Sequence, residues 1–120
     1  MSPKIDDTAF GQITVEGEVF SHDILIRLSG KVKKRKKKLS KQVYGTSHTI
    51  SLEEVEHIFE EGCRTLIVGT GQYDQVRLSP EASRFLAKRD VACILQPTPQ
   101  AIATYNTTPQ PKVGLFHVTC

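Results

Sequence analysis

SLEEVEHIFEEGCRTLIV, residues 51–68, is the stretch that decides the fold of this 120-residue chain. Ser51, followed three residues later by Glu54, predicts a capping box at the start of a helix. Apolar residues recur at helical spacing over 51–61, and Gly62 stands where a C′ glycine ends a helix. The short apolar run 65–68 predicts a buried strand. A helix that leads into a buried strand indicates an α/β domain.

The same alternation continues towards the end of the sequence. Ser79 with Pro80 predicts a helix N-cap with proline at the first helical position, and Thr98 with Pro99 repeats this pattern. Apolar runs predict further buried strands at 91–95 and 113–119. Two buried strands joined by a helical crossover form a right-handed parallel unit.

The first third of the chain reads as strands. Apolar residues flank a turn signal at Glu16-Gly17, and Ile24, Ile26 and Leu28 alternate with their neighbours as in a half-buried strand. We therefore expect one α/β domain over 1–120. It should contain a mixed central sheet covered by helices, with a small additional β-layer from the N-terminal third.

The charge distribution is uneven. Residues 31–41 hold eight of the sixteen basic side chains and none of the thirteen acidic ones, so an acidic body carries one cationic segment. We expect this segment to be a cationic loop or hairpin on which an anion or an acidic protein surface docks. The docking side chains would be Lys33, Lys34, Arg35, Lys36, Lys37 and Lys38. Nucleic acid is an alternative partner that the sequence does not favour, because no aromatic side chain or reading motif accompanies the cations.

Two polar segments that contain glycine could line a small-ligand pocket. They are Gly45, Thr46, Ser47 and His48, and Gly69, Thr70 and Gly71. The second segment follows a buried strand, where ligands bind in open α/β sheets. It lacks the third glycine of a dinucleotide motif and the lysine of a P-loop, so a tight exit turn is the competing interpretation. Adjacent Ser47 and His48 do not by themselves give nucleophile–base geometry, and no catalytic residue is assigned.

The remaining histidine, cysteine and glutamate residues indicate no cofactor. His117 and Cys120 would point to opposite faces of a strand, so we expect no metal site. We interpret Glu54, His57 and Glu60 as solvated helix surface. Three cysteines, no apolar run of membrane-spanning length and no secretory signal predict a cytoplasmic protein that does not bind membranes.

Four stretches together resemble a known family: YGTSH at 44–48, VGTG at 68–71, TPQAIATYN at 98–106 and FHVTC at 116–120, with Gly11 near the start. They are similar to the small adipogenesis-associated domain family, which also includes a mitochondrial respiratory complex I assembly factor. The resemblance implies a three-layer α/β fold with a mixed five-stranded sheet and no established activity. This chain has lysines where some members carry tryptophans before the Gly-Thr-x-His motif.

These observations predict a non-enzymatic protein-interaction or assembly-type module with a cationic docking arm. The resemblance over the chain and the segment 31–41 support this class. Two alternatives stay open: a small anionic ligand-binding or enzymatic pocket between 45–48 and 69–71, and non-specific nucleic-acid binding through 33–38. The oligomeric state is not predicted.

Overall fold

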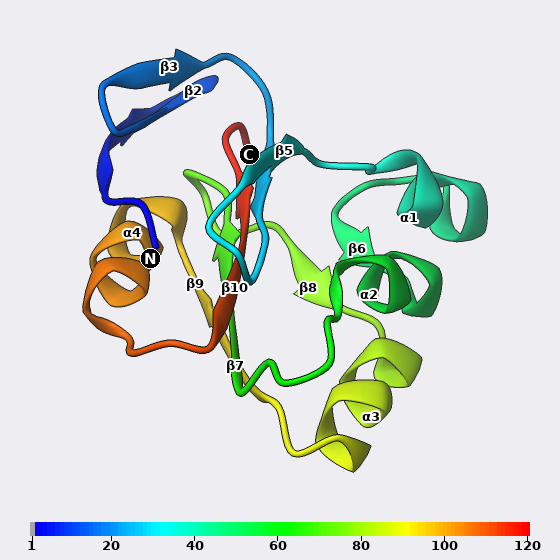
Figure 1. The fold of residues 1–120 in the computed structure, drawn as a ribbon. Helices are drawn as coiled ribbons and strands as arrows, with labels where there is room; N and C mark the ends of the chain where they lie inside the picture. Colours follow the sequence, from blue (N-terminus) through cyan, green and yellow to red (C-terminus); the bar gives the residue numbers. More distant parts are fainter. Residues whose placement is uncertain (1) are drawn as a thin grey trace.

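A five-stranded sheet forms the middle layer of the computed structural model, which describes residues 2–120 (Figure 1). Its strand order is β5-β4-β10-β7-β9. β10 pairs in parallel with β7 and β7 with β9, whereas β4 is antiparallel to both β10 and β5. The mixed five-stranded sheet is therefore confirmed. The strands are β4 (Ile24–Ile26), β5 (Val32–Lys34), β7 (Thr65–Thr70), β9 (Ala92–Gln96) and β10 (Lys112–His117).

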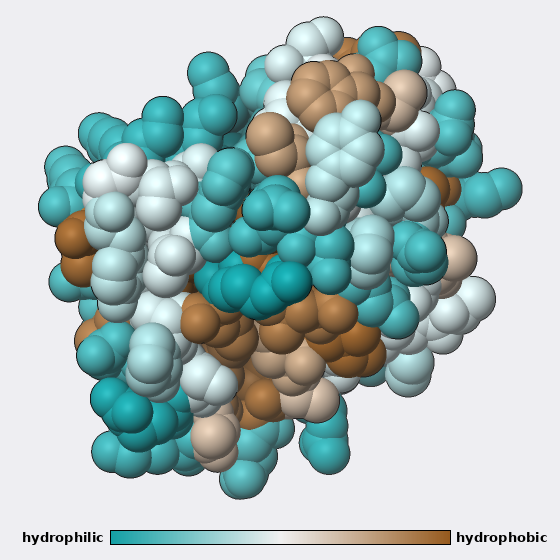
Figure 2. All heavy atoms as spheres, turned by 180° about the vertical axis from the view of Figure 1, so that it is seen from behind, coloured by the Kyte–Doolittle hydropathy of each residue, from teal (hydrophilic) through white to brown (hydrophobic). Residues whose placement is uncertain are grey.

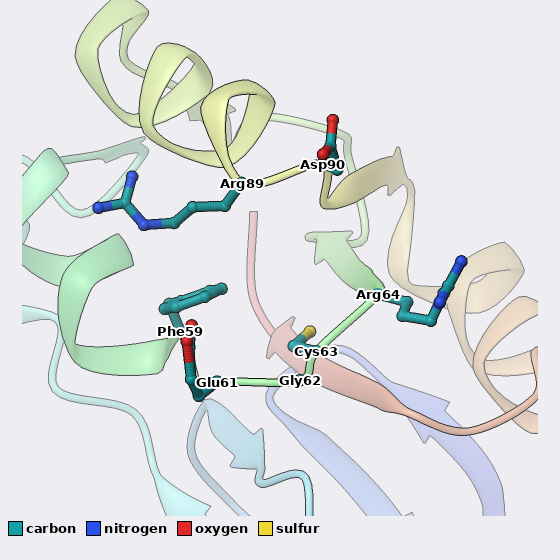
Figure 3. Close-up of a pocket in the computed structure, with 7 residues that line it drawn as sticks. All are labelled: Phe59, Glu61, Gly62, Cys63, Arg64, Arg89 and Asp90. Atoms are coloured by element: carbon teal, nitrogen blue, oxygen red, sulfur yellow. The ribbon is translucent and has the colours of Figure 1, made fainter.

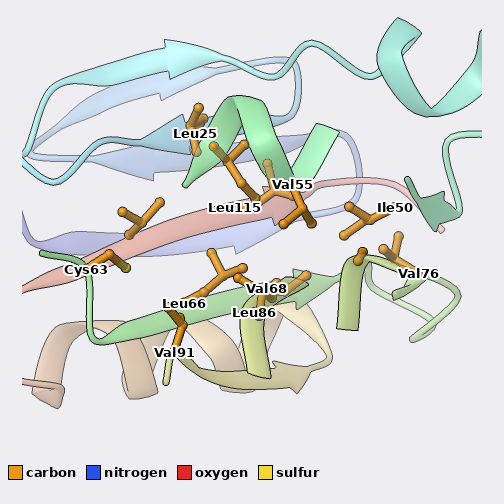
Figure 4. Packing of buried hydrophobic residues seen from close by; sticks show 13 residues of the cluster. Leu25, Ile50, Val55, Cys63, Leu66, Val68, Val76, Leu86, Val91 and Leu115 are labelled. Carbon is orange, nitrogen blue, oxygen red and sulfur yellow. The ribbon is translucent and has the colours of Figure 1, made fainter. Parts of the chain in front are cut away.

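Two helices, the second and third in chain order, cover one face of this sheet, and the first helix packs on the second. The three helices are α1 (Lys38–Tyr44), α2 (Leu52–Ile58) and α3 (Pro80–Lys88), joined by the short parallel pair β6 (Thr49–Ile50) and β8 (Arg77–Leu78). Figure 4 shows Leu66, Val68 and Leu115 of the sheet facing Val55 of α2 and Leu86 of α3. Burial of these apolar side chains holds the helices on the sheet.

The opposite face is covered by α4 (Thr98–Thr107) and a second sheet, β1 (Ile5–Ala9), β2 (Gln12–Val15) and β3 (Glu18–Phe20). Ile67 and Phe116 of the central sheet pack there with Tyr105 of α4. The Asn106 side chain joins the two covering elements, because it accepts from Ile5 N and donates to Ile5 O, both at 2.9 Å. The expected β-layer from the N-terminal third is thus present, and it makes the third layer of the domain.

Covering both faces changes the burial of β4. The alternating pattern predicted a half-buried strand, but all three residues Ile24–Ile26 are buried. Leu25 packs under the helices, whereas Ile24 and Ile26 face the N-terminal sheet. Leu28 lies beyond the strand, so the prediction of half burial was wrong.

Two predicted helix ends also differ from the structure. α2 ends at Ile58 and Phe59 is extended, so Gly62 (φ +92°) serves a later turn and is not the C′ residue. Thr98 is the first residue of α4, after Pro97, and its hydroxyl donates to His117 O at 2.6 Å instead of capping the helix. Ser79 does cap α3, since its side chain accepts from Ala82 N at 3.0 Å. No helix among residues 2–120 is long and apolar enough to cross a bilayer.

The cationic segment 31–41 takes two conformations in succession. Residues 32–34 form β5, which pairs with β4 in a hairpin, and α1 begins at Lys38. The helix was not predicted, because its sequence KLSKQVY shows no clear apolar stripe. The segment therefore ends within a helix that packs on α2.

Gly71 fixes the end of the chain against the end of β7. With φ +102°, it lies in a region that side chains rarely adopt, and an added Cβ would stand 2.2 Å from the backbone carbon of Cys120. The next two amides hold the same segment: Gln72 N donates to Thr119 O at 2.7 Å, and Tyr73 N donates to Cys120 O at 3.0 Å. Only glycine permits both the conformation and the contact.

We predict that Gly71→Ala lowers the free energy of unfolding by about 3 kcal/mol or more, because backbone strain and overpacking add. Gly62→Ala is the matched control: Gly62 has a similar φ of +92° but open space around its Cα. That control should cost only about 1–2 kcal/mol of strain. Urea unfolding of both variants measures the difference, and equal losses would contradict the close approach at Cys120.

Candidate functional site

Arg35, in the middle of the cationic segment, is turned into the protein and is only 4% exposed. Its Nε and Nη2 donate to the two Glu54 carboxylate oxygens at 2.7 and 3.0 Å. Nη1 donates to Asp23 Oδ2 at 2.9 Å, and Nη2 also donates to the Ser47 carbonyl at 2.9 Å. Burial by itself lowers the pKa of Arg35, but Glu54 and Asp23 outweigh it and raise that pKa above its ordinary value. The prediction that Arg35 is an exposed docking cation was therefore wrong.

Glu54 is fully buried, which corrects its interpretation as solvated surface. Half of the predicted capping box exists: Ser51 Oγ accepts from Glu54 N at 3.1 Å. The Glu54 carboxylate does not accept a hydrogen bond from Ser51 N. Its oxygens accept instead from Arg35 and from the Ser40 hydroxyl, whose Oγ lies 2.5 Å from Glu54 Oε1. Ser51 N instead donates to Ser40 Oγ at 2.9 Å. Glu54 thus joins α2 to α1 and to the end of β5.

Asp23 precedes β4 and is the second carboxylate of the network. Its Oδ2 receives Arg35 and His117 Nδ1 (2.7 Å), and its Oδ1 accepts from Val118 N at 2.9 Å. Burial raises the pKa of Asp23, but the His117 hydrogen bond and charge, the Val118 amide and Arg35 together lower it to about 2. Asp23 is therefore an ionised carboxylate that couples the chain end to the cationic segment.

His117 stands between Asp23 and a hydroxyl. Because a carboxylate can only accept, His117 Nδ1 donates its proton to Asp23 Oδ2. The other ring nitrogen, Nε2, accepts a hydrogen bond only when it carries no proton. That Nε2 lies 3.2 Å from Thr119 Oγ1. The Asp23 carboxylate, the His117 imidazole and the Thr119 hydroxyl are thus linked in this order. Nucleophilic catalysis by a hydroxyl uses such a series, in which the carboxylate orients the base and the base activates the hydroxyl.

A cavity of about 200 Å³ lies beside this group. Asp23, Arg35, Val118 and Thr119 contribute to its wall, together with Ser21, His22, Gly11, Lys34 and Lys37. The cavity thus combines a partly exposed hydroxyl, backed by a buried Asp–His pair, with lysines that attract anions.

The two polar loops approach each other around His117. The His48 ring lies 5.4 Å from the His117 ring, nearly perpendicular to it, and burial, then His117 and Arg35, lowers the pKa of His48. Gly71 is close to the same ring, because an added Cβ would lie 2.9 Å from His117 Cδ2. Gly69 packs against Phe116 and Thr98, and Thr70 Oγ1 donates to Asp74 at 2.6 Å. The cavity of about 200 Å³ lies on the Thr119 side of His117 and is lined by neither loop.

The other basic residues of the segment remain outside. Lys33, Lys34, Lys36, Lys37 and Lys38 are exposed, and none forms an ion pair among residues 2–120. The pKa of Lys33 is lowered, first by the charge of Lys31 and also by that of Arg27, which indicates uncompensated positive charge. A groove of about 340 Å³ runs beside them, lined by Leu25, Arg27, Lys33, Lys34, Lys36 and His57. We call these five exposed lysines the lysine surface.

A larger hollow, of about 440 Å³, lies where the loop before β7 meets the end of α3 (Figure 3). It is lined by Cys63 and its neighbours, and Arg89 extends over the Phe59 ring at 5.8 Å. Burial raises the pKa of the Cys63 thiol, which disfavours the reactive thiolate. Within residues 2–120, no group of three or more His, Cys, Asp or Glu side chains is placed to hold a metal ion.

Sequence reasoning missed Asp23, Glu54, His117 and Thr119 as members of one site. Asp23 and His117 are 94 residues apart, and no local spacing signals their contact. One signal was available for Glu54: its place in a capping box marked it as structurally constrained.

We predict that Asp23→Asn lowers the free energy of unfolding at neutral pH. Because the folded-state pKa is about 2 against an ordinary 3.8, the carboxylate stabilises the fold above pH 3.8 and loses this effect as the pH falls towards 2. The pH-dependent part of the loss should be about 2 kcal/mol and should vanish towards pH 2.

Chemical unfolding between pH 7 and pH 2 measures this effect. Asp7→Asn is the matched control, since Asp7 is an exposed acid on β1. A difference between Asp23→Asn and the unsubstituted protein that is constant over this range would contradict the ionised, hydrogen-bonded state of Asp23.

Solved structures share this fold over almost the whole chain. The conserved hypothetical protein PH1505 from Pyrococcus horikoshii OT3 is 35% identical, with a TM-score of 0.90 over 98% of this chain and 99% of that one. A structure described as MT938 is 31% identical, with a TM-score of 0.83 over 99% and 100% of the two chains. An Mth938-like domain from Bordetella pertussis, 20% identical, matches 97% of this chain and 85% of its own with a TM-score of 0.63, which supports the fold alone.

A family model described as "Protein of unknown function (DUF498/DUF598)" matches residues 5–112. The matched range includes Asp23, Arg35 and Glu54 and ends before His117. This small α/β domain with a mixed five-stranded sheet belongs to the DUF498/DUF598 family, for which no function is assigned.

Proposed function

We propose that this domain is a non-enzymatic interaction module that docks an acidic protein partner on the lysine surface. The observation that carries the proposal is the opposite placement of neighbouring cations. Arg35 turns inward to two carboxylates, while five lysines beside it have no acidic partner among residues 2–120. Their charge is therefore free to attract an external anion.

The groove beside the lysines favours a protein over a nucleic acid. Its lining is mainly cationic, from Arg27, Lys33 and Lys36, whereas Leu25 beneath them is a core residue that is only 1% exposed. Arg27 is held in place by Glu60 at 3.4 Å and by the His57 carbonyl at 3.1 Å. A partner that offers several carboxylates fits this lining. Single-stranded nucleic acid prefers stacked aromatic platforms, which residues 31–41 do not contain.

An assembly role is the class of interaction that the resemblance supports. The small adipogenesis-associated domain family, which this chain resembles, includes a respiratory complex assembly factor. We place the domain in the cytoplasm, because its three cysteines, at 63, 93 and 120, are all unpaired.

Replacing Lys33, Lys36 and Lys37 by glutamine should weaken binding of a fluorescent oligoglutamate peptide by about tenfold, since each exposed pair contributes up to about 1 kcal/mol. Fluorescence anisotropy at low salt measures the affinity. Binding to the unsubstituted domain should also weaken as salt rises, because the Debye length falls from about 10 Å at 0.1 M to about 3 Å at 1 M.

The control replaces Lys4, Lys41 and Lys88 by glutamine, three exposed lysines outside the lysine surface. This variant has the same net charge as the test variant and should keep most of the affinity. Equal losses in the two variants would contradict a defined docking surface. Tighter binding of a single-stranded oligonucleotide than of the peptide would favour the nucleic-acid alternative.

A second candidate function is a small-anion pocket with acyl-transfer chemistry at Thr119. It rests on the series Asp23, His117 and Thr119 beside the cavity of about 200 Å³. In this reaction Thr119 Oγ1 attacks an ester carbonyl and its proton moves to His117 Nε2. The alcohol leaves with that proton, and water then hydrolyses the acyl-threonine.

The second function predicts that the domain hydrolyses p-nitrophenyl acetate and that Thr119→Val slows the reaction by about 10²-fold or more. Ser47→Ala is the control, because Ser47 is buried and contributes its backbone carbonyl to Arg35. Release of p-nitrophenol is followed by absorbance. Equal rates for Thr119→Val and the unsubstituted domain would remove the catalytic candidate and leave the docking proposal unaffected.

A further inference from the structure

β9 is an edge strand of the central sheet with an open side. It pairs with β7, and no other strand among residues 2–120 pairs with it. Ala92 and Leu95 are exposed, and the residues between them are half-buried. Figure 2 shows the side of the molecule that faces away from the viewer in Figure 1, and apolar side chains gather near its centre.

The other edges of the two larger sheets carry charges that discourage pairing with another chain. β5 has Lys33 and Lys34, β1 has Asp6 and Asp7, and β3 has Glu18. Charged side chains on an edge strand are a common protection against edge-to-edge contact. β9, with the sequence ACILQ, has no charge and no proline. Its open side is therefore the unprotected edge of the central sheet.

The hydrogen-bond pattern determines which backbone groups of β9 are free. Ala92 N donates to Arg64 O at 3.0 Å, which sets the phase of the parallel pairing with β7. In a parallel ladder alternate residues face the neighbouring strand, so Ala92, Ile94 and Gln96 face β7. Cys93 and Leu95 then direct their N–H and C=O groups to the open side.

We propose that two copies of this chain pair through β9 in antiparallel orientation, with the two-fold axis at Ile94. This register places Cys93 opposite Leu95 of the second copy, and Leu95 opposite its Cys93. Both pairs consist of outward-facing residues and exchange four backbone hydrogen bonds. The free groups are thus complementary to themselves, as a two-fold contact requires.

The side chains and charges agree with this partner. The contact brings Ile94 against Ile94 of the second copy and buries the exposed Leu95 beside Cys93, with no like charges opposed. The lysine surface lies at the opposite sheet edge, at and beyond β5. In a continuous ten-stranded sheet the two β5 strands are nine strand spacings apart, about 43 Å. This distance exceeds several Debye lengths of about 8 Å, so the two cationic segments do not oppose association.

The register can be tested by a symmetric cross-link. In a variant with Cys63→Ser, Cys93→Ser and Cys120→Ser, Ile94→Cys should form a disulfide-linked dimer on mild oxidation. The two residues form a non-hydrogen-bonded pair with Cα atoms about 4.5 Å apart, which a disulfide can bridge. Ala92→Cys in the same background is the control, because it lies opposite Gln96 of the second copy. A cross-link with Ala92→Cys but not with Ile94→Cys would overturn the register.

The association itself is measured by sedimentation velocity of the unsubstituted protein. We expect a dimer that Leu95→Lys converts to a monomer, because each lysine places a charge opposite the apolar Cys93 and the two lysines lie diagonally across the same contact. Ala103→Lys, on the exposed face of α4, should remain dimeric. Circular dichroism establishes that each variant is folded. A monomer at the highest concentration measured, with no Ile94→Cys cross-link, would overturn the proposal while leaving the lysine-surface proposal intact.

Discussion

The buried ion pairs of the Arg35 guanidinium are the interaction on which the rest of the structure depends. The guanidinium bridges two carboxylates from different elements, Asp23 before β4 and Glu54 in α2. Through Ser40 the network reaches α1, and through His117 it reaches β10. Taking these charges out of water is costly, and the loss of one partner from such a buried pair costs about 3–5 kcal/mol. The network therefore fixes how the helical layer sits on the sheet more than it adds net stability.

Arginine suits this place better than the lysines that surround it. Its planar group presents several donors at once and meets both Glu54 oxygens while also reaching Asp23 and the Ser47 carbonyl. Lysine carries one compact ammonium, which cannot span these acceptors. The same difference sends the flexible lysines outward, where their charge remains hydrated. One short segment therefore supplies the buried anchor of the fold and the charged surface beside it.

Local patterns were sufficient for part of the fold. The apolar run at 65–68 identified β7, and Ser79 with Pro80 identified the start of α3, because both signals lie within a few neighbouring residues. The site was beyond such patterns. Nothing in a run of similar cations shows that Arg35 turns inward, since its partners lie 12 and 19 residues away. β1 escaped detection because its sequence, IDDTA, is mostly polar and is held by pairing with β2.

The position of the cationic segment also makes the two edges of the central sheet unequal. Arg35 follows β5 directly and there reaches Asp23 and Glu54, so the two lysines before it lie in the edge strand. The charges of Lys33 and Lys34 discourage another chain from pairing at that edge. β9, at the other edge, carries no such charges and ends at Pro97 and α4, where Thr98 binds the His117 carbonyl. The buried network thus holds one edge strand in place, whereas the uncharged β9 forms the other edge of the sheet.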